Sequence, residues 1–319
     1  MFKKQTQIES IILLRGIAAS GVCVVHFYTA HQVFYTALID RLFFMGQLGV
    51  SIFFMISGFI LPYSLYQKKY TLSNFPKFLL KRSIRIEPPY WAVIAILFVI
   101  GVIPLHLLSF KGIILHIFYL VPLFKDVKWY SAVFWTLVIE FQYYLLLGLC
   151  FPFLMKLKPL LSASLVLLAS IVCVLLKVNI KDLIFTYLYD FSAGYIVFLY
   201  FAEKISLRQV VTILLIFCIF IGFTVSIVSG VMPAITGLFI IFYKARSPKA
   251  LLFLGTISYS LYLTHDTVIH LYLDFVKTYI TNVFVLGATT IPLCIAVAYA
   301  VNLIFEQPAL KLSKKVKIN

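Results

Sequence analysis

Six ionisable side chains lie within long apolar stretches of the sequence: Arg15, His26, Glu140, Asp190, His265 and Asp266. Placing one such group inside a lipid bilayer costs about 2.5–3.5 kcal/mol on insertion scales, so each is a candidate functional residue. A histidine can take up and release protons near neutral pH, and a carboxylate can orient it. The alternative is structural, a buried pair or hydrogen bond that holds two helices together. Each residue taken alone leaves both interpretations open.

Arg15 and His26 are eleven residues apart, a spacing that returns to almost the same face of an α-helix. On one helix they would lie roughly 16 Å apart along its axis. Small residues come between them, including Gly16, Ala19 and Gly21. Such a stripe suits close helix packing, and it equally suits a narrow polar channel.

If each apolar stretch is a transmembrane span, four of the ionisable residues lie at a similar depth in the membrane, in its outer third. They are His26, Glu140, Asp190 and His265. Helix packing alone gives no reason for groups from four helices to share a depth. We therefore expect them to line a shared functional cavity near the outer face.

A second candidate site precedes the third apolar stretch, where residues 81–85 read KRSIR and residues 87–91 read EPPYW. Arg82 and Arg85 would face the same way on a helical turn, and two guanidinium groups can hold one phosphate group. The prolines favour a helix start, and Tyr90 and Trp91 could cover a nucleotide base. The alternative is a positive-inside anchor that touches lipid phosphates.

The spacing of histidines and cysteines argues against a haem or metal site. His26 and His31 are five residues apart, as are His265 and His270, so neither pair stacks two imidazoles on one helix face. The five cysteines are scattered through apolar stretches without CxxC spacing. We interpret them as small buried apolar side chains and expect no metal.

The elements that carry these residues are predicted to be transmembrane helices. Of 319 residues, 63% are apolar and 12% are charged, which excludes a soluble globular domain. A span needs about 20 apolar residues. The sequence therefore predicts an all-α fold, a single domain over residues 1–319 with about ten spans. They are expected over residues 8–30, 44–66, 88–110, 132–155, 159–177, 183–202, 208–229, 231–244, 250–273 and 281–305.

The basic residues predict the orientation of these spans. The net charge of +16 comes from short basic clusters between apolar stretches, a pattern typical of membrane proteins rather than of nucleic-acid-binding proteins. With the N-terminus inside, the inner segments hold 19 Lys and Arg residues and the outer segments hold 7. This asymmetry predicts that both termini face the cytoplasm. The outer loop 111–131 contains an apolar stretch, residues 112–124, suited to an interfacial or re-entrant helix.

Taken in order, six groups of residues resemble the bacterial membrane-bound acyltransferase-3 family. They are residues 14–19 with 24–27, 49–59, 82–85 with 88–91, 134–144, 255–265 and 305–308. Each motif is weak alone, but the ordered set covers essentially the whole chain. One departure is Pro62, where the family often has a glycine three residues after Ser-Gly-Phe.

The resemblance implies a ten-helix membrane enzyme that moves an acyl group, usually acetyl, from cytoplasmic acyl-CoA to a hydroxyl of a glycan or similar substrate. In the family the arginine and histidine of the first span are essential, and the histidine is catalytic. These correspond to Arg15 and His26. The family's Arg-x-x-Arg pair, assigned to acyl-CoA binding, corresponds to Arg82 and Arg85. Its terminal Glu-x-Pro corresponds to Glu306 and Pro308.

We therefore expect an O-acyltransferase of the bacterial inner membrane that acts on a cell-surface polysaccharide, with no nucleic acid partner. His26 would act as general base or acyl relay. The residues expected beside it are Arg15 and Glu140 in catalysis, Arg82, Arg85, Tyr90 and Trp91 at the acyl-CoA, and Asp190, His265, Ser57 and Glu306 around the substrate cavity. The rival hypothesis is a glycan or lipid transporter whose pathway the same polar residues line.

Overall fold

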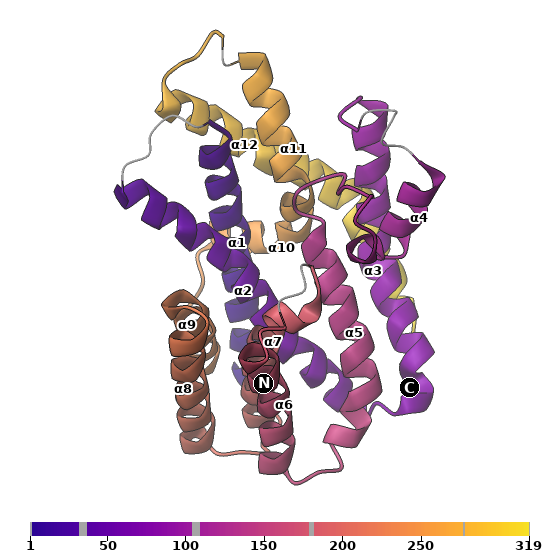
Figure 1. Cartoon of the computed structure of the whole chain (residues 1–319), viewed down its shortest axis with the longest axis vertical. Coiled ribbons are helices and arrows are strands. Elements are labelled where there is room, and N and C mark those ends of the chain that lie inside the picture. Colours follow the sequence, from indigo (N-terminus) through magenta and orange to yellow (C-terminus); the bar gives the residue numbers. More distant parts are fainter. Residues whose placement is uncertain (1, 32–36, 104–108, 179–181, 277, 319) are drawn as a thin grey trace.

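The part of the chain that the structure describes consists of helices joined by turns and loops, and no strand occurs within it (Figure 1). The computed structural model describes residues 2–31, 37–103, 109–178, 182–276 and 278–318, without the side chains of residues 2–8, 31 and 37–47. His31 and five residues of the charge comparison, Lys3, Lys4, Arg41, Lys181 and Lys277, fall outside the described side chains.

Thirteen α-helices run through the described residues. They are α1 (Phe2–His31), α2 (Ala37–Gln67), α3 (Phe75–Val99), α4 (Phe110–Ile117), α5 (Trp135–Leu154), α6 (Pro159–Leu175), α7 (Leu188–Phe201), α8 (Leu207–Thr224), α9 (Ile227–Phe242), α10 (Lys249–Thr256), α11 (Ser258–Val276), α12 (Val283–Val301) and α13 (Gln307–Lys315). Three 3-10 turns and one π-helical turn, Asn302–Glu306, complete them.

Six helical segments of the described chain are long and apolar enough to cross a membrane. They are Glu9–Ala30, Leu48–Gln67, Trp135–Leu154, Ile184–Phe201, Leu207–Thr224 and Val283–Lys315. Two shorter apolar helices, Pro159–Leu175 and Ile227–Phe242, accompany them. The expectation of an all-helical, multi-pass membrane protein is confirmed at this level.

The predicted span 88–110 has different bounds in the structure. The prolines at 88 and 89 do not begin a helix: α3 starts at Phe75 and continues through both of them to Val99. Helices in membranes tolerate prolines because neighbouring helices and local adjustments satisfy the freed backbone groups. Near these prolines, the Tyr259 hydroxyl donates a hydrogen bond of 2.7 Å to the Ile86 carbonyl, which is not one of the two carbonyls that the prolines leave free.

The predicted span 250–273 is also wrong in one respect, because the helix breaks at Ile257. The Thr256 hydroxyl donates to the Phe253 carbonyl, and the Ser258 hydroxyl donates to the Gly255 carbonyl. Side-chain hydroxyls that take backbone carbonyls in this way compete with the helix ladder. The break separates α10 from α11, and α11 carries the residues of the candidate site.

The central helix α2 packs against α1, α7 and α9. Glycines allow the closest crossings: a Cβ on Gly194 of α7 would overlap the backbone of Met55 and Gly58 on α2. A Cβ on Gly16 of α1 would likewise overlap the backbone of α10 at Leu251. The stripe of small residues in the first span is thus packed at Gly16 and buried at Ala19, which is 1% exposed, whereas no atom lies within 4 Å of the Cβ position of Gly21.

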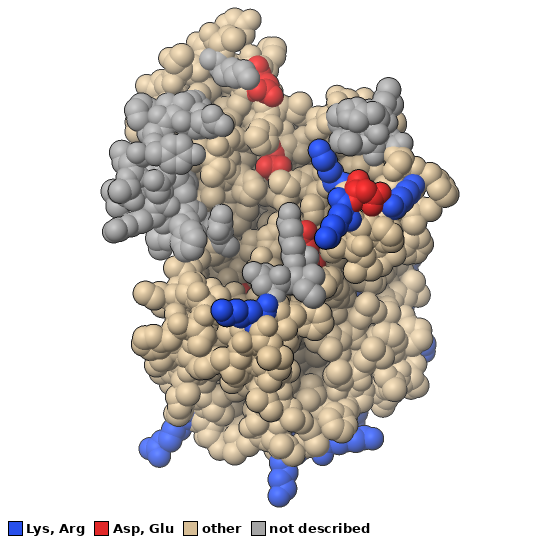
Figure 2. Space-filling model, viewed as in Figure 1, with Lys and Arg blue, Asp and Glu red and all other residues tan. Residues whose placement is uncertain are grey.

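The surface separates apolar from charged regions. Helix α8 exposes large apolar side chains to its surroundings, including Ile216 at 64% and Phe223 at 89%. In Figure 2 a broad belt of the molecule has few charges, while the lower end carries basic side chains and the acidic ones in view lie in the upper half. The turns from α5 to α6 and from α7 to α8 lie at that lower end (Figure 1).

The crossing of α2 and α7 yields a stability prediction. Gly194→Ala should lower the free energy of unfolding by about 1–3 kcal/mol, because the added methyl meets backbone atoms that cannot rotate away. Gly21→Ala is the matched control, since no atom lies within 4 Å of its Cβ position. Thermal unfolding in detergent measures both. Equal melting temperatures for the two variants would contradict the close crossing.

Candidate active site

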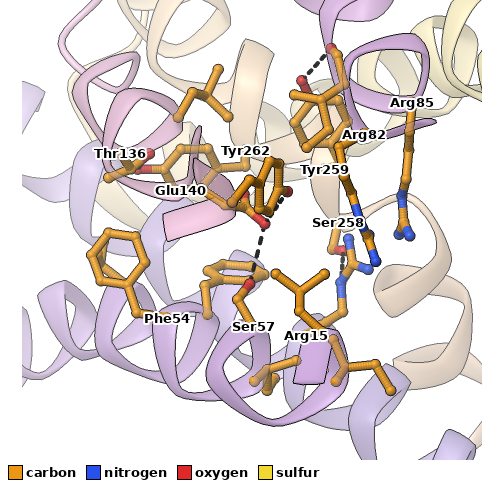
Figure 3. A pocket seen from close by; sticks show the side chains of 18 of the residues that line it. Arg15, Phe54, Ser57, Arg82, Arg85, Thr136, Glu140, Ser258, Tyr259 and Tyr262 are labelled. Atoms are coloured by element: carbon orange, nitrogen blue, oxygen red, sulfur yellow. Dashed lines mark hydrogen bonds between the residues drawn. The ribbon is translucent and has the colours of Figure 1, made fainter. Parts of the chain in front are cut away.

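Three arginines line one cavity, which we call the arginine cavity. Arg15 reaches it from α1, and Arg82 and Arg85 reach it from α3. Figure 3 shows their guanidinium groups together at one side, with Glu140, Thr136 and Tyr262 toward the other. Arg82 and Arg85 thus line one cavity together with Arg15 rather than lying on separate surfaces.

The arginines retain unused capacity to donate hydrogen bonds. The Nε of Arg15 donates to the Ser258 hydroxyl at 3.1 Å. The Nε of Arg82 is buried without a hydrogen-bond partner, and its guanidinium carbon lies 5.6 Å from the centre of the Tyr144 ring. No ion pair is recorded between these arginines and either carboxylate of the same cavity, Glu140 or Glu306. Guanidinium groups so placed suit a bound phosphate or pyrophosphate.

Glu140 lies in the arginine cavity and is held in place by two hydroxyl groups. Its Oε1 accepts hydrogen bonds from Ser57 at 3.1 Å and from Tyr144 at 2.6 Å (Figure 3). Ser57 and Glu140 thus sit together as cavity residues, on α2 and α5. Figure 3 shows the carboxylate turned toward the cavity that the arginines line.

Glu306 lines the same cavity, where its carboxylate holds the start of α11. Its Oε2 accepts from the Ser260 backbone N–H at 3.3 Å, from the Ser260 hydroxyl at 2.6 Å and from Asn302 Nδ2 at 2.8 Å. The π-helical turn at Asn302–Glu306 brings the carboxylate to this position. A negative charge at a helix N-terminus is favourable, so Glu306 fixes the helix that carries Ser258 and Tyr259.

A second cavity, which we call the histidine cavity, is lined by His26, Asp190, Ser51 and Ser229 among others. The Asp190 carboxyl is 1% exposed; its Oδ1 accepts from the Ser51 hydroxyl at 2.5 Å. Its Oδ2 is buried with no hydrogen-bond partner. A buried, unpaired acceptor beside several hydroxyls suits a substrate that carries hydroxyl groups.

His26 forms a hydrogen bond with Asp266, which our sequence analysis did not assign to the site. The imidazole Nδ1 and Asp266 Oδ1 are 2.9 Å apart. A carboxylate accepts, so Nδ1 carries the proton and Nε2 keeps its lone pair for chemistry. The Nε2 of His270 lies 3.7 Å from the same carboxylate oxygen.

The prediction that His265 lines the cavity is wrong. His265 is completely buried; its Nδ1 lies 3.0 Å from the Leu261 carbonyl, and its ring meets the His26 ring edge-on at 4.8 Å. Two adjacent helical residues point in directions about 100° apart, so only one of His265 and Asp266 can face His26 with its polar atoms. The direction in which each residue of the helix points was the signal that could have identified Asp266 as the partner of His26.

The four residues that we expected at one depth do not share a cavity. Glu140 lies in the arginine cavity, whereas His26 and Asp190 lie in the histidine cavity. The expectation was wrong because depth along a span does not determine which side of its helix a residue occupies. Arg15, likewise, lines a different cavity from His26 on the same helix.

Tyr90 and Trp91 do not line either cavity. Tyr90 is 1% exposed, and its ring packs between Tyr119 at 5.6 Å and Phe134 at 4.9 Å. The prediction that Tyr90 covers a nucleotide base is therefore wrong, since its faces are already occupied. Trp91 is 41% exposed on the outside of α3.

Comparison with known proteins identifies the chain's relatives at the level of a family. A family model described as an acyltransferase domain matches residues 8–301. This range includes all the residues of the two cavities named above except Glu306. No curated protein and no solved structure matches the chain.

The contacts of Glu306 predict a structural effect. Glu306→Ala should lower the free energy of unfolding by about 1–3 kcal/mol, because Ser260 and Asn302 lose a buried acceptor. Glu203→Ala, at an exposed position, is the control. The thermal unfolding midpoint in detergent checks the difference. An unchanged midpoint in Glu306→Ala would show that this carboxylate does not hold α11.

Proposed function

The chain belongs to membrane acyltransferase family 3, and on that premise we propose that it transfers an acyl group, acetyl foremost, from cytoplasmic acyl-CoA to a hydroxyl of a cell-surface polysaccharide. The observation that carries this proposal is the succession of the two cavities along the same helices. Arg15 precedes His26 on α1, and Tyr144 and Glu140 follow Trp135 on α5. Along these helices, the arginine cavity, suited to an anionic donor, thus lies next to the histidine cavity, which contains the imidazole of His26.

We place the enzyme in a bacterial inner membrane with about ten crossings and both termini in the cytoplasm. The ten proposed crossings would be the six candidate segments, the two shorter apolar helices, and α3 and α11. The arginine cavity lies nearer the start of α1 than the histidine cavity does. Helix α1 starts in the lower half of the molecule, whose lower end carries basic side chains with no acidic ones in view (Figures 1 and 2). Under the positive-inside rule this half faces the cytoplasm, where acyl-CoA is found.

The arginine cavity would bind the phosphates of acyl-CoA. Arg82 and Arg85 would hold the pyrophosphate, with Arg15 deeper along the path of the pantetheine arm. The unpartnered Nε of Arg82 supports this assignment, because a buried donor without a partner is costly until an acceptor arrives. The thin, largely uncharged arm would then extend toward the histidine cavity.

His26 would act as the general base of the transfer. Its Nε2 takes the proton of the acceptor hydroxyl as the oxygen attacks the thioester carbonyl carbon. A new C–O bond forms, the C–S bond breaks, and the proton passes from Nε2 to the departing CoA thiolate. Asp266 holds the imidazole in the tautomer that leaves Nε2 free and stabilises the positive charge that develops on the ring. If the acyl group instead passes through the histidine, Nε2 is again the reacting atom.

The acceptor would lie among the hydroxyl and carboxyl groups of the histidine cavity. Asp190 Oδ2 is free to accept a hydrogen bond from a sugar hydroxyl, and Ser51 and Ser229 offer further partners. The rival hypothesis, a glycan or lipid transporter, gives no reason to bind CoA, so a CoA-binding measurement separates the two.

Binding of the donor is predicted to depend on Arg82. Arg82→Ala should weaken the binding of CoA by about 1.5–3 kcal/mol, the magnitude of a hydrogen bond to a charged group. Arg208→Ala removes an exposed arginine of α8 and should leave the affinity unchanged. Isothermal titration of the purified protein with CoA measures both. Equal affinities in Arg82→Ala and the unmodified protein would reject this donor site.

Catalysis is predicted to depend on the pair His26 and Asp266. His26→Ala should lower the transfer rate by about 10²–10⁴-fold, the usual contribution of general acid–base catalysis, while CoA binding is retained. Asp266→Asn should also lower kcat, because an amide can stabilise the wrong tautomer. The measurement is acetyl transfer from labelled acetyl-CoA to glycan in membranes that contain the protein. Full transfer by a folded His26→Ala protein would refute the mechanism.

A further inference from the structure

The two cavities share two lining residues, Val50 of α2 and Tyr262 of α11. On α2, the histidine cavity takes Leu48 and Ser51, and the arginine cavity takes residues from Phe53 onward. On α11, the arginine cavity takes Ser258 and Tyr259, and Tyr262 reaches both cavities. The boundary between the cavities therefore runs through Val50 and Tyr262, which we call the partition.

The Tyr262 ring is held in place from both sides. It is 7% exposed, and its hydroxyl lies 3.0 Å from Thr136 Oγ1, a residue of the arginine cavity. The ring meets Phe53 edge-on at 5.8 Å and lies 5.7 Å from the ring of His265. Figure 3 shows Tyr262 on the side of the arginine cavity away from the guanidinium groups.

The partition is coupled to the reacting histidine through α11. Tyr262 and Asp266 are four residues apart on this helix, so they lie on one face, one turn apart. Asp266 holds His26, and His265 packs against both His26 and Tyr262. A group that crosses from the arginine cavity to His26 at the lining shared by the two cavities would pass beside the Tyr262 ring.

We propose that Tyr262, with Val50, selects the acyl group by its cross-section. This inference rests on the proposed function, because it assumes that a donor in the arginine cavity delivers its acyl group to His26. A compact acetyl group passes the partition, and an acyl group with a bulky end does not. Tyr262 is a specificity-determining and positioning residue: it limits passage, while bond formation takes place at His26.

The test uses two reactive donors that differ in cross-section, bromoacetyl-CoA and 4-(bromomethyl)benzoyl-CoA. Each alkylates an accessible imidazole: a bond forms between Nε2 and the bromine-bearing carbon, bromide leaves, and the Nδ1 proton is released to solvent. Mass spectrometry of the peptide that contains His26 gives the rate for each reagent. The quantity compared between variants is the ratio of the aromatic to the compact rate, in which intrinsic reactivity cancels.

We expect bromoacetyl-CoA to label His26 of the unmodified protein, with protection by CoA. Tyr262→Ala should raise the ratio at least about tenfold, since it removes a ring similar in size to the aromatic reagent. Val50→Ala should raise it in the same direction by less, and it provides the test if Tyr262→Ala does not fold. Tyr262→Phe keeps the ring and should keep the ratio. Tyr259→Ala removes an equal ring from the arginine cavity alone, and it should keep the ratio too.

Two outcomes separate this inference from the proposed function. If CoA-protected labelling of His26 occurs but neither Tyr262→Ala nor Val50→Ala changes the ratio, the partition does not select and the proposed function stands. A rise of the same size in Tyr259→Ala also refutes selection by Tyr262. If bromoacetyl-CoA fails to label His26 in the unmodified protein, the delivery of the donor to this residue fails, and the proposed function fails with it.

Discussion

The hydrogen bond between His26 and Asp266 is the interaction on which the candidate site depends. It joins α1 to α11 across 240 residues of sequence and determines which imidazole nitrogen is free. An unpaired buried charge is strongly unfavourable, so the Asp266 carboxylate, whose side chain is 12% exposed, is stabilised by this hydrogen bond. This contact requires that α11 be accurately positioned relative to α1. The break at Ile257 lets α11 start separately from α10, and the Glu306 carboxylate holds the first turn of α11 through Ser260.

A second constraint is the presence of three arginine side chains in one cavity of a membrane protein. Arg15, Arg82 and Arg85 share one cavity and face Glu140 across it without a direct ion pair between them. Mutual repulsion of three guanidinium groups disfavours this cavity, and an anionic ligand would relieve it.

Much of the helical fold could be predicted from the sequence, because apolar length and basic clusters dominate membrane insertion. Motif order likewise identified Arg15, His26, Arg82 and Arg85, and all four line cavities. The errors arose where the environment of a residue depends on how the helices pack against one another. Pro88 and Pro89 lie inside a helix, and Tyr90 is enclosed by aromatic rings. His265 packs its ring against His26 without lining either cavity, while Asp266 forms the hydrogen bond to His26. The sequence periodicity of one helix does not show which of its faces will pack against a helix that is distant in sequence.

The measurement that tests the account most directly is a cryo-electron microscopy structure of the protein with a non-hydrolysable acetyl-CoA thioether. The account predicts the pyrophosphate on Arg82 and Arg85, the pantetheine arm beside Tyr262, and the carbonyl group of the analogue within reach of His26 Nε2. A ligand whose carbonyl stays among the arginines, or one bound elsewhere on the molecule with the two cavities unchanged, would contradict it.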